Sequence, residues 1–151
     1  MLRKFLTLSL LIFASCGNQG YIRDALRFEY VINGEKGYIL NEVIFILESN
    51  GYLMDYSQIG KNYEFIKTEF NVFDLTEALI ARDRIIVDIF ERGQSSIFYD
   101  YGVYKIVLRI QYQVSGDGRK WINSTPDGAS LKRYETIDYQ IRKKFFFDLL
   151  Y

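Results

Sequence analysis

The alternation of hydrophobic and polar residues is most regular over residues 103–114. Every second residue there is apolar or aromatic, and the residues between them include Lys105, Arg109, Gln111 and Gln113. Because successive side chains of a β-strand point to opposite faces, this pattern predicts a strand with one face on a core and the other in water. A similar alternation over residues 26–32 predicts a first strand. Residues 63–72, rich in aromatic and β-branched residues, predict a second.

Two segments before the strand at 103–114 have apolar residues at helical spacing. Residues 37–50 fit a helix that ends at Asn50 and Gly51, although the apolar run at 43–46 also suits a buried strand, and we favour the helix. Asp74 is a candidate N-cap, with Glu77 three residues later and apolar residues at helical spacing as far as residue 90. Gly93 would end this second helix.

The last third of the chain is divided by two turn-forming segments, residues 115–118 and 124–128. They predict a β-meander that continues through residues 119–123 into a strand at 131–141, and residues 142–151 close the chain as a strand or short helix. We therefore expect one α+β domain over residues 26–151. It would contain an antiparallel sheet with a C-terminal β-meander and about two helices packed on one face.

Residues 1–18 contain the parts of a secretory signal in their usual order. Arg3 and Lys4 are followed by ten largely apolar residues, a helix of roughly 15 Å that is too short to span a bilayer. The small residues Ala14 and Ser15 then precede Cys16. This arrangement resembles the lipobox of bacterial lipoprotein precursors. Phe13 stands where leucine is usual, and spirochaete lipoproteins are similar in tolerating bulky residues there.

The resemblance implies cleavage before Cys16, so that residues 1–15 are a signal peptide and residues 16–25 a lipidated tether. Cys16 would carry a diacylglyceryl group and a further acyl chain such as palmitate, which together anchor a protein firmly. Gly17 after the cysteine resembles the sorting signal for the outer membrane. The expected location is therefore the cell membrane or the outer membrane, on its surface or periplasmic side. The alternative is an ordinary signal with a chance cysteine.

The composition removes several classes of chemistry. The chain has no histidine and a single cysteine, so Ser-His-Asp and Cys-His systems and most zinc sites are excluded. No phosphate loop, dinucleotide fingerprint or calcium loop is present, and we expect Asp117 and Asp127 to form turns. A formal net charge of zero gives no reason to expect nucleic acid. We predict a protein that is not an enzyme and has no metal or cofactor. A carboxylate-dependent hydrolase remains as a remote alternative.

A basic region in residues 101–151 provides the candidate binding surface, with nine basic and five acidic residues. Trp121 follows Arg119 and Lys120 beside a turn, where a hairpin tip would present it to a partner, or it would cover the edge of the sheet. The meander could bring further basic residues to the same side: Lys132, Arg133, Arg142, Lys143 and Lys144. Such a surface would bind a protein, an anionic polymer or lipid headgroups, or would pair with the acidic N-terminal part of the domain.

These features predict a lipid-anchored protein of the cell envelope that binds a partner. A second hypothesis comes from the order of three predicted elements: the opening strand at 26–32, the helix that ends in residues 47–52, and a later strand. This pattern resembles small outer-membrane assembly lipoproteins of the lipopolysaccharide-assembly type. The resemblance implies a structural accessory that docks on a larger assembly from the periplasmic side.

Overall fold

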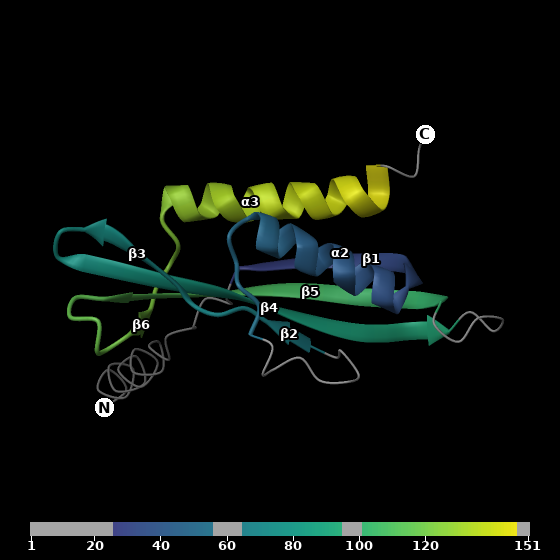
Figure 1. Cartoon of the computed structure of the whole chain (residues 1–151), viewed down its shortest axis with the longest axis horizontal. Coiled ribbons are helices and arrows are strands. Elements are labelled where there is room, and N and C mark those ends of the chain that lie inside the picture. Colours follow the sequence, from purple (N-terminus) through teal and green to yellow (C-terminus); the bar gives the residue numbers. More distant parts are fainter. Residues whose placement is uncertain (1–25, 56–64, 95–100, 148–151) are drawn as a thin grey trace, which may run out of the picture.

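The structure is a computed structural model that describes residues 26–55, 65–94 and 101–147. Two long strands, β4 (Leu79–Gln94) and β5 (Tyr101–Ser115), form its centre. They pair antiparallel from Ile80 opposite Ser115 to Gln94 opposite Gly102, with one register shift between Glu91 and Gly93. The α+β class with an antiparallel sheet and two helices is confirmed (Figure 1).

Four short strands complete the sheet, two on each side of the central pair. The strand β1 (Arg27–Glu35) and the two-residue strand β6 (Ile122–Asn123) both pair with β5. The strands β2 (Phe65–Lys67) and β3 (Asn71–Thr76) both pair with β4. All of these pairings are antiparallel.

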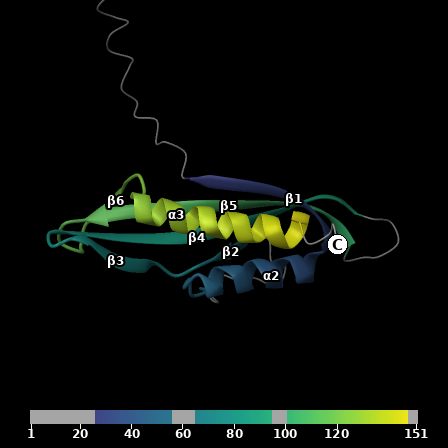
Figure 2. The ribbon, with the colours of Figure 1, turned by 90° about the horizontal axis from the view of Figure 1, so that it is seen from above.

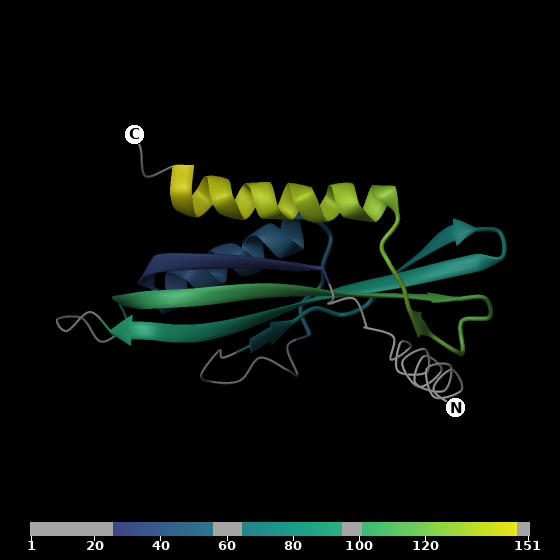
Figure 3. The same ribbon diagram turned by 180° about the vertical axis from the view of Figure 1, so that it is seen from behind.

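Both helices lie on the same side of the sheet. The helix α2 (Lys36–Ser49) ends where Gly51 adopts a left-handed φ of 84°, which glycine permits without strain. The helix α3 (Gly128–Arg142) runs along the long strands and continues into the π-helical segment η2 (Lys143–Phe147). Figures 1 and 2 show the two helices side by side over this face, and the opposite face has no described helix on it (Figure 3).

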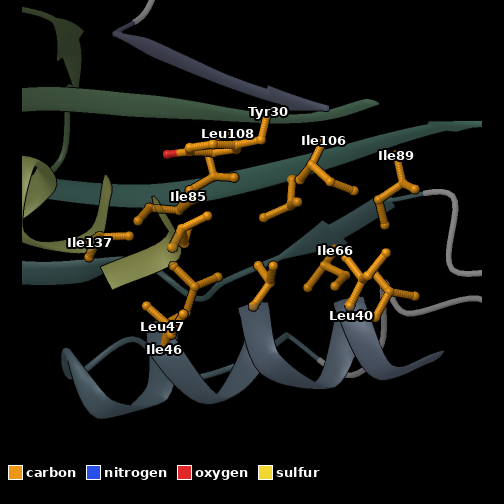
Figure 4. Packing of buried hydrophobic residues seen from close by; sticks show 14 of the residues in the cluster. Tyr30, Leu40, Ile46, Leu47, Ile66, Ile85, Ile89, Ile106, Leu108 and Ile137 are labelled. Atoms are coloured by element: carbon orange, nitrogen blue, oxygen red, sulfur yellow. The ribbon is translucent and has the colours of Figure 1, made fainter. Parts of the chain in front are cut away.

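The core lies between this face and the helices. The buried side chains of the strands alternate with outward-facing ones, as in Tyr30 and Ile32 of β1 or Ile106 and Leu108 of β5. The helix α2 contributes residues at helical spacing, and several of them point toward the strands in Figure 4. Polar contacts also join α3 to its neighbours: for example, the hydroxyl of Tyr30 donates to Asp138 at 2.8 Å, and Asn50 donates to Gln140 at 2.7 Å.

Several predicted elements are confirmed at close to their expected positions. The strands predicted at residues 26–32 and 103–114 correspond to β1 and β5, and residues 37–50 form the favoured helix. The strand predicted at 63–72 is divided between β2 and β3. Thr68 lies between them, and its backbone N–H and hydroxyl oxygen bond the carbonyl and the N–H of Ile85.

Two predictions are wrong. Residues 74–93 do not form a helix: Asp74 lies in β3, and β4 occupies Leu79–Gln94. All odd-numbered residues from 81 to 89 are buried, which is the two-residue period of a strand with one covered face. Residues 131–141 are not a strand but the middle of α3, whose buried residues Ser130, Tyr134, Ile137 and Ile141 follow the helical period.

Candidate functional site

The face of the sheet turned away from the helices is the candidate site, and we call it the open face. It consists of the even-numbered residues from Ile80 to Phe90 of β4, the odd-numbered residues from Lys105 to Ser115 of β5, and their neighbours on β1, β2 and β3. The strand registers arrange these residues in rows across the sheet. One row contains Val72, Arg82, Gln113 and Asn123, and another contains Lys67, Ile86, Arg109 and Arg27.

Four cations on these rows have carboxylate partners. Arg109 donates two hydrogen bonds to Asp88, one of 2.9 Å, and Lys67 lies 3.6 Å from Asp55. Arg27 and Lys105 both pair with Glu29, the latter at 2.6 Å.

These ion pairs also cover part of the open face. Val107 lies between Asp88 and Glu29 in the register and is only 2% exposed, although neither of the described helices lies over it. Long paired side chains therefore shield this part of the sheet from water.

Two other cations on the open face, Arg82 and Arg84, have no carboxylate partner among the described residues. The guanidinium of Arg82 lies between two aromatic rings, 4.1 Å from the centre of Phe70 and 4.2 Å from that of Trp121. Arg84 lies 4.3 Å from the same Phe70 ring. We call Phe70, Arg82, Arg84 and Trp121, with the two glutamines described next, the arginine platform.

Two glutamines of β5 fix the orientation of these guanidinium groups. Arg82 donates from Nε to Gln113 at 2.8 Å, and Arg84 donates from Nε to Gln111 at 2.7 Å. Gln113 in turn donates to Asn123 of β6 at 3.0 Å. Partial burial lowers the pKa of both arginines, and the charge of Arg82 lowers the pKa of Arg84 further, while the charge of Asp55 acts on Arg84 in the opposite direction. Two like charges therefore lie close together, held by rings and amides.

The predicted binding residues do not form one surface. Trp121 is half-buried on Arg82, while Arg119 and Lys120 are exposed in the adjoining turn and donate their backbone N–H groups to Asp117. Lys132 and Arg133 instead belong to α3, on the helical side of the molecule. Asp117 forms a turn as expected.

The other predicted basic residues lie at the end of α3 and pair locally. Arg142 bonds Asp138 one helical turn earlier, and Lys144 lies 3.2 Å from Glu42 of α2. The second of these contacts agrees with the expected pairing between the basic C-terminal part and the acidic N-terminal part. Between the two helices lies an open groove of about 260 Å³, lined by Glu42, Phe45, Ile46, Ser49, Gln140, Lys143 and Lys144.

Arg133 is part of a buried polar cluster around Asp83 of β4. The Oδ2 atom of Asp83 accepts hydrogen bonds from Arg133 at 2.7 Å, from Tyr52 at 3.0 Å and from Tyr134. Burial and the neighbouring carboxylate raise the pKa of both tyrosines well above the ordinary value, so they remain protonated donors. The cluster joins β4, α3 and the segment after α2. Its contacts are those of a structural link.

Neither a family model nor a curated protein matches this sequence. No group of three or more histidine, cysteine, aspartate or glutamate side chains placed to hold a metal ion occurs in the described part of the chain. Within the same ranges no helix is long and apolar enough to span a membrane. Phe13, Ala14, Ser15 and Cys16 lie outside the described residues.

Sequence reasoning missed most of the arginine platform. Gln111 and Gln113 were placed correctly on the outward face of their strand, but Arg82 and Arg84 were assigned to a helix and Phe70 was not singled out. The missed signal is the spacing of Arg82 and Arg84 by two residues, which puts both on one face only if the segment is a strand.

Proposed function

We propose that this protein is a lipid-anchored component of the cell envelope that binds an anionic partner on the open face of its sheet and performs no chemical step. The anchoring part of the proposal rests on Cys16, which follows a basic start, a short apolar run and two small residues. The binding part rests on the arginine platform.

The observation that carries the binding proposal is the difference between paired and unpaired arginines on one surface. Arg27 and Arg109 have carboxylate partners, whereas Arg82 and Arg84 are oriented by amides and aromatic rings. A guanidinium group can bond a carboxylate, sulfate or phosphate through two parallel N–H groups, and ordering it in advance reduces the entropy lost on binding. The platform therefore favours a partner that supplies negative charge.

Leu26, at the start of the domain, lies close to the arginine platform and connects it to the proposed anchor. The carbonyl of Leu26 accepts a hydrogen bond from the N–H of Ile110, which is adjacent in sequence to Gln111 of the platform. Ten residues, 16–25, connect Leu26 to the lipidated end and reach at most about 35 Å when fully extended. The proposed anchor is thus short enough, and attached near enough to the platform, for the open face to reach the membrane.

Membrane fractionation tests the anchoring. The wild-type protein should remain with membranes after washing with high salt. Residues 16–151 with Cys16→Ala, exported behind an ordinary cleavable signal, should be released because this variant has neither acyl chains nor the apolar leader. Equal retention of both proteins would contradict lipid anchoring.

Photo-crosslinking in intact cells tests the binding face separately. Val72 lies beside Arg82 in the register and is 62% exposed, and Tyr139 on α3 is 60% exposed on the helical side. A photoreactive residue at position 72 should give an adduct that is absent at position 139 and is lost in the R82Q/R84Q variant. Adducts of equal yield at both positions would argue against the open face as the binding surface.

The second hypothesis, a structural accessory of outer-membrane biogenesis, is favoured by the other end of the open face. Val31, Phe65 and Phe90 expose 48%, 36% and 52% of their surface there, as a docking site on a larger assembly requires. Protease treatment of intact cells separates the alternatives. A surface-displayed domain would be digested, and survival of the domain would favour a periplasmic accessory.

A further inference from the structure

We infer that the arginine platform binds the phosphate groups of anionic phospholipids, so that the open face lies against the headgroups of the membrane that carries the protein. This inference rests on the proposed function for the identity of that membrane. The observations that carry it are the geometry of the two arginines, the side chains around them and the position of the tether.

The two arginines are spaced to hold phosphate groups. Arg82 and Arg84 point to the same face of one strand, about 7 Å apart along it. Each uses its Nε–H for a glutamine, and neither forms an ion pair with a described carboxylate, although the charge of Asp55 acts on Arg84 from a greater distance. A phosphate between or beside them would relieve the repulsion of two adjacent positive charges.

The surroundings of the platform match an interfacial membrane contact. Trp121 provides an aromatic ring with a polar N–H, which favours the headgroup region, and Val72 adds an exposed apolar side chain in the same row as Arg82. The adjoining turn adds the exposed cations Arg119 and Lys120. Basic, aromatic and apolar side chains together are typical of surfaces that lie on anionic bilayers.

The attraction to an anionic membrane comes from the arginine platform and its neighbouring cations, because the net charge of the chain does not favour it. Residues 16–151 contain 17 basic and 19 acidic residues, so the chain without its leader has a net charge of −2 and is not drawn to an anionic surface as a whole. A local cluster of cations would therefore orient the molecule. The tether begins two strands away from Arg84, on the same end of β5 as the platform, so the anchor and the platform can engage one membrane.

Vesicle binding tests the inference without the lipid anchor. The chain starting at position 16, with Cys16→Ala so that no lipid is attached, is sedimented with vesicles of phosphatidylglycerol and phosphatidylcholine or of phosphatidylcholine alone. We expect binding to the anionic vesicles only. The R82Q/R84Q variant should bind about 25-fold more weakly, roughly fivefold for each arginine.

The K132Q/K143Q variant is the matched control, because it removes two exposed cations from the helical side. Its binding should stay within roughly twofold of the unsubstituted chain, since these residues lie far from the headgroups in the inferred orientation. Equal losses in both double variants would overturn the inference, as would equal binding to neutral vesicles. Preferential binding to a phosphate-free acidic polysaccharide would also overturn it and would identify another class of partner.

Trp121 provides a second measurement that needs no substitution at the platform, because it is the only tryptophan in the chain. Lipids with a nitroxide on the headgroup should quench its fluorescence when the protein is bound, and unquenched fluorescence of vesicle-bound protein would contradict the inferred orientation. If vesicle binding fails while membrane retention in cells depends on Cys16, this inference fails and the anchoring proposal stands. Vesicle binding combined with membrane retention that does not depend on Cys16 would support this inference and contradict the anchoring proposal.

Discussion

The two faces of the sheet use charged residues in opposite ways. On the face covered by the helices, Asp83 is fully buried and receives three hydrogen bonds from two tyrosines and an arginine. On the open face, Asp88 lies five residues further along the same strand and pairs with Arg109 near water. A single strand thus presents one acid to the core and one to the surface. We expect the covered face to determine stability and the open face to determine binding.

The largest expected effect is at Asp83. Asp83→Ala would leave two tyrosine hydroxyls and the Arg133 guanidinium without their shared acceptor, and breaking such a buried ion pair costs about 3–5 kcal/mol. Urea unfolding followed by circular dichroism measures this loss. Asp88→Ala is the matched control and should cost less than about 1 kcal/mol, because it removes a surface ion pair. Similar losses for the two variants would mean that the faces do not differ as described.

Two neighbouring isoleucines test the same comparison with apolar side chains. Ile85 is 1% exposed on the covered face, so Ile85→Ala should lower the free energy of unfolding by about 2–5 kcal/mol. Ile86 is half-buried on the open face, and Ile86→Ala should cost about 1 kcal/mol. Denaturant titration of both variants measures the difference. Equal costs would contradict the strand assignment of this segment.

A smaller effect is expected at the start of α3, which closes the covered face. Asp127 caps this helix by accepting the N–H of Ser130 at 2.9 Å, and Asp127→Ala should cost about 1 kcal/mol. Asp74→Ala should change stability by less than about 0.5 kcal/mol, because Asp74 is exposed in β3 and caps no helix. A cost at position 74 equal to that at 127 would contradict the strand at residues 71–76.

The cap also gives a pH dependence of known sign. The hydrogen bonds from Ser130 lower the pKa of Asp127 below its ordinary value of 3.8. A carboxyl whose pKa is lower in the folded state contributes its full stabilisation above its unfolded pKa and loses it as the pH falls through the folded value. The difference in unfolding free energy between wild type and Asp127→Ala should therefore be constant near neutral pH and shrink below about pH 4. A difference that grows in acid would contradict the capping contact.

Only a small effect on stability is expected on the arginine platform. Arg82→Gln removes two ring contacts at a partly exposed site and should lower the free energy of unfolding by less than about 1 kcal/mol. The emission spectrum of Trp121 should change, because the guanidinium leaves its ring. A loss comparable to that of Asp83→Ala would assign the platform to stability and not to binding.

The predictable part of the fold came from strands with a simple alternation. Residues 103–114 have apolar residues on one face and polar residues on most of the other, so periodicity alone identified β5. Asn50 and Gly51 similarly marked the end of α2 because the left-handed conformation at Gly51 favours glycine.

The strand β4 was not predictable in the same way, because both of its faces break the pattern. Asp83 places a charge among the buried residues, and Ile86 and Phe90 place apolar side chains on the open face. Asp74 and Glu77 in addition imitated a helix start. Sheet pairing with β5 overrides these local signals, and a single sequence contains no direct information about that pairing.

The helix α3 was missed for a different reason. Tyr139 and Ile141 alternate with polar residues as in a strand, yet Tyr139 is 60% exposed and the buried set is Ser130, Tyr134, Ile137 and Ile141. The signal for the helix was present in Asp127, which was read as a turn residue but serves as an N-cap. The wrong assignments of β4 and α3 also affected the candidate site, because Arg82 and Arg84 were placed on a helix and Arg133 on a strand.

Metabolic labelling with a radioactive fatty acid tests the central claim, lipid attachment at Cys16, most directly. Cells that produce the wild-type protein or the Cys16→Ala variant are compared after immunoprecipitation of equal amounts of protein. The account predicts label in the wild-type protein and none in the variant, together with a longer, uncleaved chain for the variant. Equal label in both proteins, or no label in either, would contradict it.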